Sequence, residues 1–274
     1  MWQQKDTTWL DLSRRDLTVL PELPPNLLYL NCKHNALTEL PPLPDTLQHL
    51  FCDQNQLPSL PPLPKSLITL TCSHNLLESL PELSPTMNRL ECTNNRITHL
   101  PNLPNTMAKL WIDANQIDTL PDLPDSLTNL GMNHNSISHL PSLPQRLEYL
   151  WCGANRLSTF PSVPNTLKKL ICFSNQLSFL PELPKIMTEL KCEGNPWNET
   201  LYRYMKHANN PHLGINMYYE NRRMIRERAR SLYSLQRLSD HLPISDDIIH
   251  SVGHCLSGES GVVAKQLDCL KQWE

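Results

Sequence analysis

Hydrophobic residues recur every 20 positions along roughly two thirds of this chain, in nine copies that run from about residue 21 to residue 198. The copy that contains Leu47, Leu50 and Cys52 is typical: two leucines three residues apart are followed, two positions later, by another apolar residue. Leu50 and Cys52 point to the same face of a short strand, because side chains alternate along a strand. Since one copy cannot bury its own leucines, the pattern predicts stacked copies whose parallel strands form a sheet on the concave face of a solenoid.

Proline and asparagine mark two further positions of the period. Proline opens every copy from Pro21 to Pro181, and the Leu-Pro-x-Leu-Pro segment around it predicts an extended or polyproline II convex side rather than a helix. An asparagine follows every strand, and its amide can both donate to and accept from backbone groups where the chain turns. We therefore predict a structural asparagine ladder, formed by Asn35, Asn55, Asn75, Asn95, Asn115, Asn135, Asn155, Asn175 and Asn195.

These patterns divide the chain into three parts. Residues 1–20 are a degenerate N-terminal capping half-repeat, and residues 21–198 are the nine repeats. Residues 199–274 contain few prolines and have apolar residues at helical spacing, so they predict a small helical C-terminal cap. The helices expected there cover 199–208, 215–238, 245–256 and 262–273.

The N-terminal half-repeat departs from the pattern. Arg15 stands where the ladder asparagine belongs. Because the ends of a solenoid must hide their apolar faces, we expect Trp2 and Trp9 to cover the first leucines.

The unit Leu-Pro-x-Leu-Pro-x-x-Leu-x-x-Leu resembles the short leucine-rich repeats of bacterial type III effectors of the YopM and IpaH-like families. It also looks like the leucine-rich repeats of giant-virus proteins of the Marseillevirus kind. The resemblance covers about two thirds of the chain. It implies an α/β leucine-rich-repeat superhelix that binds a protein partner, in a viral or bacterial host-interaction factor. IpaH-like effectors carry a ubiquitin-ligase domain after their repeats, but the surroundings of Cys255 and Cys269 do not match its Cys-x-Asp context.

Charge and motifs exclude several other functions. The formal net charge is −3, which favours neither nucleic acid nor an anionic membrane as a partner. The basic cluster at 222–230 also contains glutamate, so we interpret it as a solvated, salt-bridged helix face, with nucleic-acid or phosphate contact as the alternative. There is no glycine-rich phosphate loop, no Gly-x-Ser-x-Gly, no His-Glu-x-x-His and no apolar run long enough to span a membrane. We therefore predict no enzyme activity and no cofactor.

Seven of the nine cysteines lie on the 20-residue series, between positions 32 and 192, and the two gaps in the series hold Ile112 and Met132. A position that accepts Cys, Ile or Met requires a buried apolar side chain, so we predict core thiols rather than disulfides or metal ligands. Unpaired thiols favour a reducing compartment. The expected location is the cytoplasm, or the host cytosol if the protein is viral or a secreted effector.

The strand positions that alternate with the buried residues face outward on the concave side, and apolar residues gather among them. Exposed apolar rows tend to mark interaction sites. The predicted partner-binding residues are Phe51, Trp111, Tyr149, Trp151, Ile171 and Phe173. Gly131 and Gly153 are expected to leave a shallow recess beside the tryptophans.

Three alternatives stay open for this surface and for the tail. A second copy could cover the concave patch in a homodimer, or the helical tail could fold back over it. A third alternative is a bipartite adaptor, in which an F-box-like segment at 242–249 recruits ubiquitin-ligase machinery to a target held by the repeats.

Overall fold

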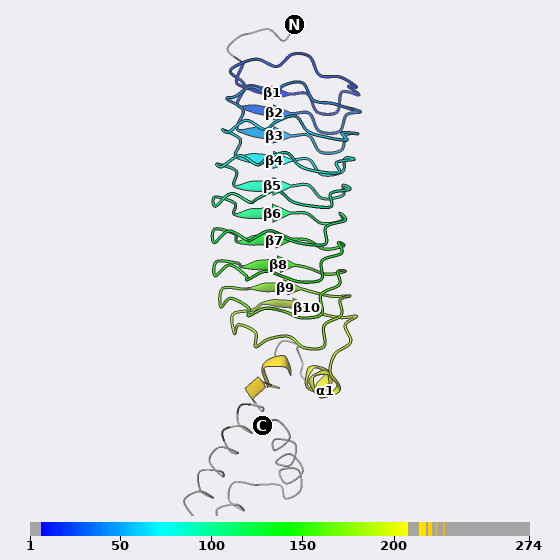
Figure 1. Cartoon of the computed structure of the whole chain (residues 1–274), viewed down its shortest axis with the longest axis vertical. Coiled ribbons are helices and arrows are strands. Elements are labelled where there is room, and N and C mark those ends of the chain that lie inside the picture. The colour runs from blue at the N-terminus through cyan, green and yellow to red at the C-terminus, as the bar shows by residue number, and fades with distance from the viewer. Residues whose placement is uncertain (1–6, 208–213, 218, 221–222, 224–226, 228–274) are drawn as a thin grey trace, which may run out of the picture.

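The structure is a computed structural model that describes residues 7–207, 214–217, 219–220, 223 and 227 (Figure 1). In these residues, three-residue strands follow one another at intervals of 20 residues. They are β1 (Trp9–Asp11), β2 (Tyr29–Asn31), β3 (His49–Phe51), β4 (Thr69–Thr71), β5 (Arg89–Glu91), β6 (Lys109–Trp111), β7 (Asn129–Gly131), β8 (Tyr149–Trp151), β9 (Lys169–Ile171) and β10 (Glu189–Lys191). Helix α1 (Glu199–His207) follows β10, close to the first helix predicted in the tail.

The strands form one parallel sheet in chain order, and each strand is hydrogen-bonded to the next. The register aligns the central leucines, so that Leu30 lies opposite Leu10 on one side and Leu50 on the other. Each turn of the chain therefore adds one strand to the sheet and one layer to the core. This arrangement confirms the predicted repeat solenoid with a parallel sheet.

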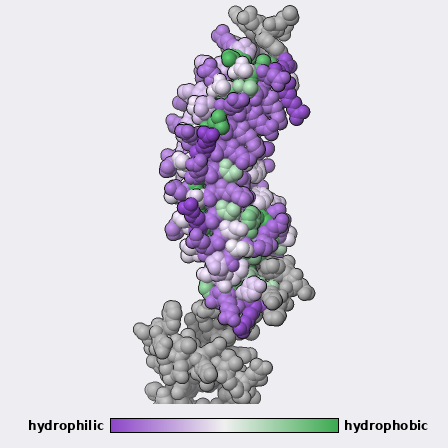
Figure 2. All heavy atoms as spheres, turned by 90° about the vertical axis from the view of Figure 1, so that its right-hand side faces the viewer, coloured by the Kyte–Doolittle hydropathy of each residue, from purple (hydrophilic) through white to green (hydrophobic). Residues whose placement is uncertain are grey.

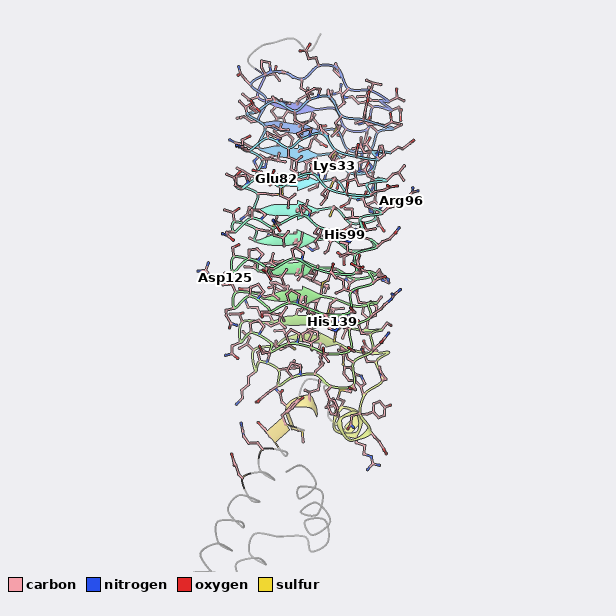
Figure 3. All side chains as sticks on the ribbon, in the orientation of Figure 1. Lys33, Glu82, Arg96, His99, Asp125 and His139 are labelled. Atoms are coloured by element: carbon pink, nitrogen blue, oxygen red, sulfur yellow. The ribbon has the colours of Figure 1, made fainter. Side chains whose placement is uncertain are left out.

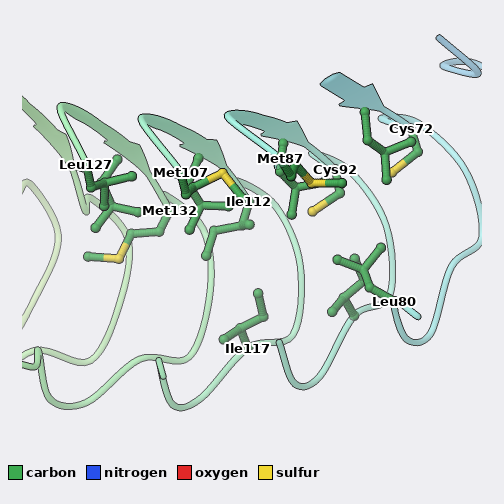
Figure 4. Packing of buried hydrophobic residues seen from close by; sticks show 14 of the residues in the cluster. Cys72, Leu80, Met87, Cys92, Met107, Ile112, Ile117, Leu127 and Met132 are labelled. Carbon is green, nitrogen blue, oxygen red and sulfur yellow. The ribbon is translucent and has the colours of Figure 1, made fainter. Parts of the chain in front are cut away.

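The core is a continuous column of leucines and sulfur-containing side chains beneath the strands (Figure 4). In the middle of the array Met87 and Met107 replace leucine, and Ile112 and Met132 occupy the cysteine position, all fully buried. Leucine and methionine have similar volumes, so the exchange fits a close-packed interior. The seven cysteines of the series are buried and free.

One backbone feature was not predicted. The residue before each ladder asparagine has a positive φ, at non-glycine residues from His34 (55°) to Ser174 (48°) and at Gly194 (68°), and Arg14 (56°) adopts it before Arg15 in the half-repeat. The left-handed conformation turns the chain sharply after the strand, and it is unfavourable for residues that carry a Cβ. Only the last copy meets this requirement with glycine.

The ladder asparagines bond successive turns to each other. Asn55 Nδ2 donates to the carbonyl oxygens of Cys32 and Cys52, both at 3.0 Å, and its Oδ1 accepts from the amide of Leu37 at 3.1 Å. The other eight asparagines make the equivalent bonds, from Asn35 to Asn195. Each amide thus satisfies backbone groups of two copies at the turn.

A second, interrupted ladder of hydroxyl groups joins copies just before six of the strands. Thr106 Oγ1 lies 2.9 Å from the carbonyl oxygen of Pro85 and 2.8 Å from that of Met87, and can donate its proton to either. The members are Thr46, Ser66, Thr86, Thr106, Ser126 and Thr166. The sequence shows these hydroxyl residues at the same 20-residue spacing, so the ladder could have been predicted.

Side chains of the half-repeat satisfy backbone groups at the first strand. Arg15 Nη2 donates to the carbonyl oxygen of Asp11 at 3.1 Å, and Asp11 Oδ1 accepts from the amide and hydroxyl of Ser13 at 2.9 and 2.6 Å. The Ser13 hydroxyl is the main reason that the pKa of Asp11 is lowered. The expectation that Trp9 covers the first leucines was wrong, and Trp2 lies outside the described residues. Trp9 is 57% exposed on the concave face, because it alternates with the buried Leu10.

At the other end, α1 and the residues after it pack on the last repeat. Leu201 and Ile215 are fully buried in the core cluster. The Asn216 side chain accepts from the amide of Leu183 and donates to its carbonyl oxygen, both at 3.1 Å. This part of the tail closes the apolar end of the array. No helix in the described part of the chain is long and apolar enough to cross a membrane.

Candidate partner-binding surface

We define the concave face by the side chains at three positions in each copy. The first two are the first and third residues of the strand, and the third lies two residues after the strand ends. These side chains project from the sheet, while the central leucine points inward. The side of the solenoid that follows the strands is mostly hydrophilic, with small scattered apolar patches (Figure 2). Charged residues such as Arg96 and Asp125 project outward from the loops on opposite sides (Figure 3). The concave face differs in that aromatic rings contact one another there, as Tyr149 and Trp151 do.

Tyr149, Trp151 and Phe173 form an aromatic group near the C-terminal end of this face, which we call the C-terminal patch. The rings of Tyr149 and Trp151 are stacked, with centroids 5.9 Å apart. Lys169 Nζ lies 5.7 Å from the Trp151 centroid, and His134 meets the edge of Phe173 at 6.2 Å. The aromatic side chains are only partly buried, so they offer apolar surface to a partner.

Two expectations about this patch were wrong. Ile171 is only 4% exposed, because it lies between Trp151 and Lys191 on the neighbouring strands. The glycines do not leave an empty recess either. A Cβ on Gly131 would lie 2.7 Å from Trp111 Cδ1, and one on Gly153 would lie 2.4 Å from the Phe173 ring. Each glycine therefore gives an aromatic ring room to lie against the neighbouring strand.

Trp9, Tyr29, His49 and Phe51 form a second aromatic group, which we call the N-terminal cluster. Trp9 stacks on Tyr29 with centroids 5.4 Å apart, and Tyr29 contacts Phe51 at 5.0 Å. Phe51 was predicted to belong to the binding surface, but its association with Trp9 and Tyr29 was not predicted. The signal was available, since these two residues occupy one position in successive copies.

Ion pairs hold most charged side chains of the concave face. Lys33 Nζ is 2.7 Å from Asp53 Oδ2, Lys169 Nζ is 2.7 Å from Glu189 Oε2, and Arg89 pairs with Glu91. The hydrogen bond from Lys169 is the main cause of the lowered pKa of Glu189. Arg89 also stacks on Trp111, 5.4 Å from its centroid.

The third position of the concave face carries its own hydrogen bonds. Asp53 Oδ1 accepts from the amide of Ser73 at 2.8 Å, and Ser73 Oγ accepts from the amide of Thr93 at 3.1 Å. Asp113 and Asn133 repeat the arrangement, since Asp113 Oδ1 accepts from the Asn133 amide at 2.9 Å and Asn133 Oδ1 from that of Gly153 at 2.7 Å. The side chains at this position therefore accept hydrogen bonds from the backbone of the next copy, in addition to any contact that they make with a partner.

Two observations on the described residues concern metal binding and thiol reactivity. These residues contain no group of three or more histidine, cysteine or acidic side chains that could hold a metal ion. Burial raises the pKa of Cys32 and Cys192 to about 12, and it raises the pKa of the other thiols of the series as well. These thiols are therefore protonated near neutral pH.

Several predictions concern tail residues that lie wholly or partly outside the described residues. Residues 242–249, with the F-box-like segment, lie outside the described residues, as do Cys255 and Cys269. Only Arg223 and Glu227 of the basic cluster at 222–230 are described. The adaptor and nucleic-acid alternatives stay predictions.

Solved structures resemble this chain, although no protein-family model and no curated protein matches it. YopM, an effector of Yersinia pestis, is 33% identical with a TM-score of 0.63, over 73% of this chain and 63% of YopM. The leucine-rich repeat domain of a Shigella effector is 34% identical with a TM-score of 0.53, over 56% of this chain and 72% of that domain. The InlJ domain of Listeria monocytogenes, which includes a cysteine ladder, is 21% identical with a TM-score of 0.50, over 71% of this chain and 55% of that one, and shares the fold alone. The similarity to giant-virus proteins stays a prediction.

Proposed function

Because this chain belongs to the leucine-rich repeat proteins and is similar to bacterial effectors, it is a protein-interaction module, and we propose that it captures a protein partner on its concave face. One observation carries the proposal. The C-terminal patch places the partly exposed rings of Tyr149 and Trp151 on β8, with that of Phe173 just after the neighbouring strand β9. Large aromatic side chains supply most of the binding energy in many protein interfaces.

The scaffold suits recognition by shape rather than by rearrangement. The asparagine and hydroxyl ladders tie every turn to its neighbours, so the concave side chains are held in fixed rows. A preorganised surface loses little conformational entropy on binding. The proposed function needs no catalytic group or cofactor.

We place this activity in a reducing compartment, the cytoplasm or a host cytosol, because the seven buried cysteines of the repeats are free. A role as a host-interaction factor is part of the same proposal. It rests on the likeness to the Yersinia and Shigella effectors. This chain spans 63% of the length of YopM.

The test is affinity purification from the native cells with tagged protein, followed by affinity measurement on the partner recovered. Trp151→Ala with Phe173→Ala should weaken capture by at least about tenfold while the protein stays folded. The control is Val19→Ala with Leu76→Ala, which removes two exposed apolar side chains from outside the concave face. Capture that survives the first pair of changes would contradict the assignment of the site.

Two further measurements separate the alternatives. Trp9→Ala with Tyr29→Ala tests the N-terminal cluster as the site of capture. Sedimentation velocity tests self-association. If the wild-type protein is a dimer and the variant with Trp151→Ala and Phe173→Ala is a monomer, the result would favour a homodimer formed through the concave face over capture of another protein.

A further inference from the structure

The concave face contains its own example of a bound ammonium group. Lys33 Nζ lies 2.7 Å from Asp53 Oδ2 and 5.0 Å from the centroid of Phe51. The same carboxylate oxygen accepts from Thr71 Oγ1 at 2.5 Å, and Oδ1 accepts from the amide of Ser73. An aromatic face and a carboxylate together hold a cation well, because both present negative charge to it.

Trp111 and Asp113 reproduce this arrangement three copies later. They occupy the positions of Phe51 and Asp53 in the repeat. Asp113 Oδ1 accepts from the amide of Asn133 at 2.9 Å and from its side-chain amide at 2.7 Å, so the carboxylate is oriented in a similar way.

The groups that satisfy Asp53 Oδ2 are absent at the second position. Thr93 stands where Lys33 would be, and Gly131 stands where Thr71 would be. Asp113 forms no salt bridge with any described residue, and its Oδ2 receives no hydrogen bond from them. The repeat thus keeps the aromatic ring and the carboxylate, but no described cation joins the two, because Arg89, which lies over the Trp111 ring, pairs with Glu91.

Gly131 sets the geometry of this position. A Cβ there would lie 2.8 Å from Asp113 Oδ2 and 2.7 Å from Trp111 Cδ1, so the carboxylate and the indole both rest against the glycine backbone. Burial raises the pKa of Asp113, with the hydrogen bonds from Asn133 and the nearby His134 acting in the opposite direction. The carboxylate is therefore partly shielded from water and has no ion pair among the described residues.

The neighbouring cations do not fill the position. Arg89 stacks on Trp111 but pairs with Glu91, and Lys109 is exposed on the same strand as Trp111 without an ion pair among the described residues. His134 affects the Asp113 charge but makes its ring contact with Phe173.

We propose that Trp111 and Asp113 receive the ammonium group of a lysine side chain of the partner protein, in the manner in which Phe51 and Asp53 receive Lys33. The proposal rests on the proposed function, and it names the chemistry of one partner residue. Gly131 and Trp151 lie on the strand positions beside this site, so the lysine would bind next to apolar contacts at the C-terminal patch.

The first test uses the monomeric probe Nα-acetyl-lysine methylamide and needs no partner. In ¹⁵N-labelled protein, the Trp111 indole and Gly131 amide signals should shift and saturate in the millimolar range. The norleucine analogue, which lacks the ammonium group, should leave them unchanged, and Asp113→Asn should abolish the response to lysine. Equal shifts with norleucine, no shift with lysine, or a response that survives Asp113→Asn would each overturn the proposal.

The second test supplies the missing cation within the chain. Thr93→Lys should form the pair with Asp113, lower the pKa of that carboxyl and prevent the probe from binding. Thr93→Met is the control, because it adds similar bulk without charge. A Thr93→Lys protein that is no more stable than Thr93→Met, with the Asp113 pKa unchanged, would contradict the inferred geometry. Failure of either test would not contradict partner capture through Trp151 and Phe173, because the Trp151→Ala and Phe173→Ala variants test that capture separately.

Discussion

Asn115 Nδ2 donates a hydrogen bond at 3.0 Å to the carbonyl oxygen of Cys92, which lies 23 residues earlier in the chain. The same amide group donates to Ile112, and Asn115 Oδ1 accepts from the amide of Ile97 at 3.0 Å. One side chain therefore satisfies backbone groups of two turns. Because each such bond joins two neighbouring turns, its loss at one turn should lower the stability of the stacked repeats.

Asn115→Leu is expected to lower the free energy of unfolding by about 1–3 kcal/mol, since it leaves backbone groups without partners beside the core. Urea denaturation followed by circular dichroism measures the change. Asn102→Leu is the matched control, because Asn102 is exposed on a loop. Equal stability of the two variants would show that the ladder contributes little.

Ala154→Gly is expected to raise stability by about 0.5–1 kcal/mol, because glycine adopts a positive φ without the steric cost that a Cβ brings. Ala154 has a φ of 51°. The same change at Ala108, which is not among the positive-φ residues, should lower stability because glycine makes the unfolded chain more flexible. Thermal melting of both variants measures the opposite signs, and a loss of stability at both positions would contradict the prediction.

The seven cysteines of the repeats should react slowly with a bulky maleimide in the native protein. They are buried, and burial raises their pKa, so little thiolate is present and the reagent cannot reach it. Mass spectrometry after timed labelling identifies which thiols react. After denaturation all nine cysteines of the chain should be modified. Fast native labelling at Cys92 or Cys152 would be incompatible with the packed core.

Asp113→Asn should raise the melting temperature near pH 7 and have little effect near pH 3. The pKa of Asp113 is raised from its ordinary value of 3.8 by burial, so the folded state holds the proton more tightly than the unfolded chain does. The cost of ionisation is absent below the unfolded pKa and fully present above the folded pKa. The asparagine keeps an oxygen that can accept from Asn133. Asp125→Asn, at an exposed loop position, is the control, and a pH-independent effect at position 113 would rule out ionisation as the cause.

Much of the candidate surface followed from counting along the sequence, and the parts that did not have local physical causes. Tyr149 and Trp151 were correctly placed on one face of a strand, because side chains alternate along it. Ile171 was expected to be exposed, but its neighbours on two strands leave it 4% exposed. The glycine recess was wrong for a similar reason: the space beside a glycine is taken by whichever ring can reach it.

The sequence alone determined the architecture, because a 20-residue period in leucine, proline and asparagine has only one way to bury its apolar residues. Strand positions, register and the buried cysteine column all follow from that period. Only the tertiary structure decided how the concave side chains pair. Lys33 and Asp53 are 20 residues apart, and whether they meet depends on side-chain reach across neighbouring strands, which periodicity does not encode. The same reach leaves Asp113 without an ion pair among the described residues, and the character of the concave face depends on such differences between equivalent positions.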